Sequence, residues 1–168
     1  SEAEYVAASL LDLSEDRIST IIKALSLVAN DETPFVIPRE LNEIWFRQLP
    51  DLAYGMEWTL LLLQEVIDKF IPSFRTILAL DGQTLDTVKA AIVPDNSTID
   101  SFPDVVHAYL ATRTSHDFPF RIATHELRNH LLDAGMINAT ELIYAMPKAL
   151  KDRRFVWSDN GESVLILK

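Results

Sequence analysis

The chain has 168 residues, a length that suits one domain or two small ones. Hydrophobic residues make up 48% and charged residues 24%, which is typical of a folded globular protein and does not indicate disorder. The absence of cysteine excludes a disulfide framework and a thiolate metal site, and favours a cytoplasmic protein. The most apolar stretch, residues 58–71, is interrupted by polar side chains, and the acidic start lacks the basic region of a signal peptide. We therefore expect no membrane association.

The net charge of −10 is unevenly distributed. Residues 121–168 contain seven basic and six acidic side chains, a net of +1, so residues 1–120 carry −11. An acidic body would repel a phosphate backbone at long range, although salt limits that repulsion to about 8–10 Å. The difference indicates two regions with different roles.

The first third of the sequence predicts three helices and one extended segment. Residues 2–13 form a short apolar helix, and Ser14 is an N-cap before a second helix with acids in its first turn. Residues 33–37 are predicted to be extended, because a residue before proline avoids helical geometry. Pro38 then opens a third helix that ends before Pro50.

The middle of the sequence predicts further helices. The strongest pattern is 54–71, which is apolar on all sides around residues 60–63 and ends at Pro72. Shorter helices are predicted at 74–80 and 84–93, and residues 94–98 form a clear loop. Ser101 caps the next helix, with Pro103 in its first turn, and a polar connector at 114–118 leads to Pro119. We place a domain boundary there, between an acidic helical body (1–118) and a C-terminal unit (119–168).

The C-terminal unit has a recognisable order of elements. Residues 124–134 form a helix that ends at Gly135, and the capping pair Asn138 and Glu141 precedes a second helix that ends at Leu150. Two β-rich runs, 154–157 and 163–167, flank an Asp-Asn-Gly turn, which is a good hairpin signal.

Helix, tight turn, helix and hairpin in this order resemble the winged-helix superfamily, over the last third of the chain only. The sequence thus predicts a mostly α, α+β protein in which a helical body precedes a winged-helix-like unit. The resemblance implies that the second helix would enter a DNA major groove and that the hairpin would be the wing. The residues implied for nucleic-acid or partner contact are Thr140, Tyr144, Lys148, Lys151, Arg153, Arg154 and Trp157.

Each of these residues also has a simpler interpretation. The basic side chains can be ordinary solvated charges, partly paired with Asp152, or part of a protein-binding surface. Trp157 can pack in the core instead of stacking on a base. Many winged helices assemble with proteins, and a fold does not fix a function.

No motif nominates a catalytic residue, a cofactor or a metal. His125 and His130 are five residues apart, so a regular helix cannot bring them to one ion. His107 and His116 have no evident ligand partners, and the turn at Asp81 lacks the glycines of a phosphate-binding loop. The carboxylate pairs, Glu40 with Glu43 and Glu65 with Asp68, are typical of charged helix faces.

Three functions remain open at this stage. The first is a non-catalytic interaction module, a subunit or accessory domain of a larger, nucleic-acid-handling assembly, with a protein partner and no cofactor. The second is a winged-helix DNA-binding regulator. The third is an enzyme whose site no motif marks. The oligomeric state and the identity of the partner cannot be derived from the sequence.

Overall fold

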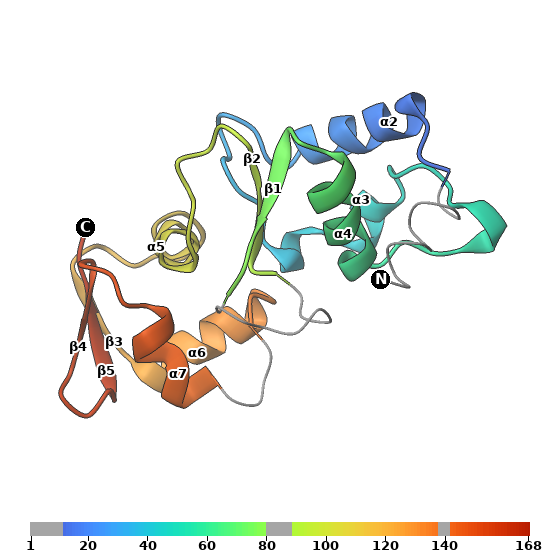
Figure 1. Ribbon diagram of the computed structural model, residues 1–168. Helices are drawn as coiled ribbons and strands as arrows, with labels where there is room; N and C mark the ends of the chain where they lie inside the picture. Colours follow the sequence, from blue (N-terminus) through green and yellow to red (C-terminus); the bar gives the residue numbers. More distant parts are fainter. Residues whose placement is uncertain (1–11, 80–88, 138–141) are drawn as a thin grey trace.

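The computed structural model describes residues 12–79, 89–137 and 142–168. Within these ranges the protein is α+β, with six α-helices and two small antiparallel sheets (Figure 1). The predicted α+β class is therefore confirmed. The predicted helix at 2–13 and the capping pair Asn138 and Glu141 lie outside the described residues.

The first half contains three α-helices and one pair of strands. Side-chain caps begin each helix: Ser14, Asn42 and Thr59 each accept a hydrogen bond from a main-chain N–H of the first turn. The elements are α2 (Glu15–Ser26), η1 (Pro38–Glu40), α3 (Glu43–Phe46), η2 (Ala53–Gly55), α4 (Leu60–Phe70), β1 (Phe74–Ile77) and β2 (Ala91–Pro94). The helix after Ser14 is confirmed. The one predicted from Pro38 divides into η1 and α3, and the one predicted at 54–71 begins only at Leu60.

The helix predicted at 74–80 is wrong, because residues 74–77 form strand β1. The helix predicted at 84–93 is also wrong at its end, since Ala91 to Val93 belong to β2. The two strands pair antiparallel, with Thr76 opposite Ile92. Apolar residues at positions 74, 77 and 78 match a helical period, but the distant partner strand decides the conformation.

The second half contains the other three helices and a three-stranded sheet. Its elements are α5 (Phe102–Arg113), β3 (Phe120–Ala123), α6 (Thr124–Asp133), α7 (Leu142–Ala149), β4 (Phe155–Trp157) and β5 (Ser163–Ile166). Ser101 and Asp104 form a capping box at the start of α5. The predicted helices and the predicted hairpin β4–β5 are confirmed. Sequence reasoning missed β3, which pairs with β5 and makes it the central strand.

The two halves have the same order of elements, although no repeat is visible in the sequence. In the first half α2 precedes a bridge between Val36 and Ile92, then α3, α4, β1 and β2 follow. In the second half α5 precedes β3, then α6, α7, β4 and β5 follow. In both sheets the last strand is central: β2 lies between Val36 and β1, and β5 lies between β3 and β4.

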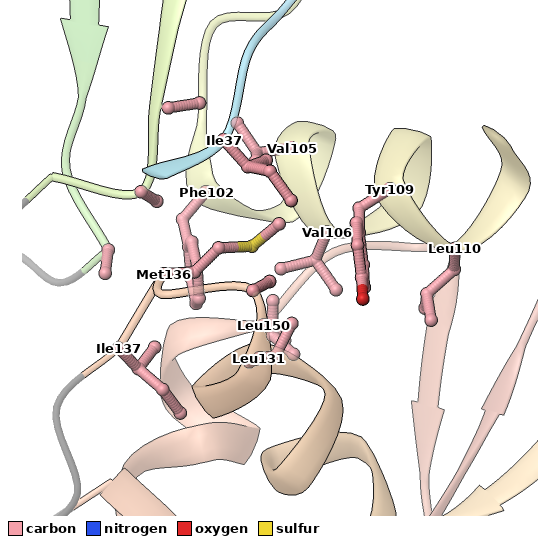
Figure 2. Close-up of a cluster of buried hydrophobic side chains, with 14 of the residues drawn as sticks. Ile37, Phe102, Val105, Val106, Tyr109, Leu110, Leu131, Met136, Ile137 and Leu150 are labelled. Atoms are coloured by element: carbon pink, nitrogen blue, oxygen red, sulfur yellow. The ribbon is translucent and has the colours of Figure 1, made fainter. Parts of the chain in front are cut away.

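Two hydrophobic clusters meet at β2. The first cluster includes Ile92 together with buried side chains of α2, α3 and α4. The second includes the neighbouring residues Ala91 and Val93 together with α5, α6 and α7. Because side chains alternate along a strand, β2 contributes to both clusters. Figure 1 shows the β1–β2 pair between the two groups of helices, and Figure 2 shows part of the second cluster.

Polar contacts also join the halves. The Arg113 guanidinium lies 4.1 Å above the Phe35 ring, donates to the Phe35 carbonyl at 3.1 Å and pairs with Glu40 at 3.2 Å. The predicted division at residue 118 stays a prediction. The structure adds that α5, which precedes that point, shares its cluster with α6 and α7. No helix in the described ranges is long and apolar enough to cross a membrane.

Candidate interaction site

A groove of about 820 Å³ lies where the two halves meet, between β1, the start of α5 and the end of α7. Strand β1 contributes consecutive residues on both of its faces, so the groove follows an edge of the strand. Phe102 and Pro103 come from the first turn of α5, and Ala145, Lys148 and Ala149 come from α7. The lining combines apolar side chains with polar ones, and its charged residues are Arg75, Asp100 and Lys148.

The edge of β1 beside this groove has main-chain groups directed away from β2. Ile92 exchanges two main-chain hydrogen bonds with Val36, at 2.9 and 3.0 Å, so its polar groups face the opposite edge of β2. Thr76 lies opposite Ile92 and belongs to a non-hydrogen-bonded pair. Its N–H and C=O consequently point away from β2. β1 pairs with β2 alone among the described strands.

Two basic residues line the groove and differ in their partners. Arg75 donates to the Asp100 carboxylate at 2.9 Å and to the Ser97 carbonyl at 2.7 Å, which ties β1 to the loop before α5. Lys148 is exposed on α7, and no carboxylate of the described residues forms an ion pair with it. Lys148 is therefore the groove-lining cation that has no ion-pair partner within the described ranges.

Arg154 holds the start of β4 against α5, and its guanidinium is engaged by carboxylates of the chain rather than free to bind a phosphate. Its guanidinium contacts Asp152 at 2.7 Å and Asp104 at 2.7 Å, and its side chain is only 22% exposed. The hydrogen bond from Arg154 lowers the pKa of Asp152 to about 2. Burial alone would raise the pKa of Asp104, but hydrogen bonds from the Asp100 N–H and from Arg154 outweigh it, so that pKa is lowered too.

We expect the Asp152–Arg154 pair to stabilise the fold in a pH-dependent way. A carboxyl group with a depressed folded-state pKa contributes stability above its unfolded pKa, near 4, and loses it as the pH falls toward 2. Asp152→Asn should lower the free energy of unfolding by about 1–2 kcal/mol at neutral pH. Urea unfolding from pH 7 to pH 2 should show this difference shrinking below about pH 4. A difference that is constant with pH would contradict the assignment, and Asp159→Asn in the exposed hairpin turn is the control.

The remaining predicted contact residues fall into three groups. Thr140 and the side chain of Tyr144 lie outside what the structure describes. Lys151 and Arg153 are exposed in the segment that joins α7 to β4. Trp157 is half-buried against the second cluster, and its Nε1–H donates to the Leu150 carbonyl at 3.0 Å. That hydrogen bond fixes the ring between β4 and the end of α7, which favours packing over base stacking.

A second hollow, of about 620 Å³, lies between the start of α6, Pro147 of α7 and the β4–β5 turn. Thr124 occupies its edge, where its main-chain N–H donates to the Glu162 carbonyl at 2.9 Å and its hydroxyl donates to the Gly161 carbonyl. These bonds hold the hairpin against the first turn of α6. His125 is the ionisable group of α6 in this hollow.

Three of the histidines, His107, His116 and His130, take part in packing or hydrogen bonding. His107 stacks on Phe118 and lies 2.7 Å from the Leu167 carbonyl. His116 stacks on Phe120, contacts the Thr114 hydroxyl and packs edge-on against His130. Across the described ranges, no three metal-binding side chains come close enough to hold an ion.

Comparison with known proteins found no matching family model, no similar curated sequence and no similar solved structure. The function must therefore be argued from the geometry of this chain.

Proposed function

We propose that the chain is a non-catalytic interaction module, a subunit or accessory domain of a larger assembly, built on the winged-helix plan. The observation that carries the proposal is the order α5, β3, α6, α7, β4, β5, with β5 central in the sheet. In a winged helix, α6 and α7 would be the helix-turn-helix pair and β4–β5 the wing. The same order in the first half supports a chain made of two such units.

The charge distribution supports a protein partner. Residues 1–120 carry −11, which opposes approach to a phosphate backbone. Arg154, one of the basic residues beside the wing, is neutralised by Asp152 and Asp104. The groove beside β1 offers main-chain groups and apolar side chains, which suit a polypeptide better than a nucleic acid.

One observation favours the alternative, a DNA-binding regulator. Lys148, Lys151 and Arg153 are exposed close together in sequence, from the last turn of α7 to the start of β4. In a winged helix this region lies between the recognition helix and the wing, where phosphates are commonly held. Three cations near one another provide a modest phosphate-binding surface.

Fluorescence anisotropy with labelled single- and double-stranded DNA and RNA over a salt series separates these two functions. For an interaction module we expect no saturable binding by the isolated chain, even at low salt. For a regulator, the binding constant should fall as salt concentration rises. In a plot of the logarithm of the binding constant against the logarithm of the salt concentration, the slope should be about one unit shallower for each phosphate contact that the Lys148/Lys151/Arg153→Ala variant removes. Saturable binding with that loss of slope would overturn the proposal.

The matched control for this experiment is Lys23→Ala. Lys23 is exposed on α2 in the first half, outside the region from α7 to β4. A salt slope that falls equally in this variant would indicate diffuse electrostatic binding, which also leaves the regulator interpretation without support.

A further inference from the structure

We draw no further inference here: the strongest candidate, the surface loop between α3 and α4 that presents Tyr54, 86% exposed and at a φ of +58°, carries nothing because no second observation in the described ranges shows what covers it.

Discussion

Ile92→Ala is expected to lower the free energy of unfolding by about 2–5 kcal/mol, and to do so equally when unfolding is followed in either half of the molecule. Ile92 is 1% exposed and packs only into the first cluster, but its neighbours Ala91 and Val93 pack into the second. Because one strand belongs to both clusters, loss of packing on one face should destabilise both.

The chain contains tryptophans that report on each cluster. Trp45 is buried in the first cluster, and Trp157 packs against the second. Urea unfolding of a Trp45→Phe/Trp58→Phe background follows Trp157 alone, and a Trp157→Phe background follows the first half. Coincident transitions that shift together in Ile92→Ala would confirm the coupling. A shift confined to the first-half probes would mean that the halves unfold independently. Ile44→Ala, at a residue 70% exposed, is the control.

Gly135→Ala should destabilise the protein by more than the same change at Gly55. Both glycines have positive φ, +74° and +68°, so alanine costs about 1–2 kcal/mol in backbone energy at either site. At Gly135 a Cβ atom would also lie 3.1 Å from the Cβ of Pro38, and 3.6 Å from the main-chain nitrogen of Arg39. At Gly55 nothing lies within 4 Å.

The difference between the two glycine variants isolates the contact between the halves. Gly135 follows α6, and the Arg39 N–H donates to the Ala134 carbonyl at 3.2 Å, so an added Cβ presses on the segment that carries η1. In chemical denaturation, we expect the loss in free energy of unfolding caused by Gly135→Ala to exceed the loss caused by Gly55→Ala by about 1 kcal/mol or more. Equal losses would mean that this contact between the halves relaxes freely.

Local sequence signals predicted the helices well where a cap marks the start. Ser14 and Ser101 both cap the helices expected after them, and Gly135 and Gly161 adopt the positive φ expected of a helix end and a hairpin turn. These features depend on neighbours a few residues away, so the sequence pattern contains them.

Features that depend on distant partners were missed. β1 was predicted as a helix because its apolar residues fit a helical period, and β3 was not predicted because it pairs with β5, some forty residues later. The same holds for the candidate site. Lys148 could be named from the sequence, but the groove beside it requires β1 and α5. Arg154 looked available because its partner Asp104 is fifty residues away.

The similar order of elements places α4 and α7 at corresponding positions in the two halves, but their surface side chains differ. α4 occupies in the first half the place that α7 occupies in the second. On α4, Glu65 pairs with Lys69 and Asp68 pairs with Lys89, while Leu61 is exposed. On α7 the exposed Lys148 has no such partner in the described part of the chain. The two corresponding helices therefore differ in surface charge, so a contact made through Lys148 of α7 has no counterpart on α4 in the described part of the chain.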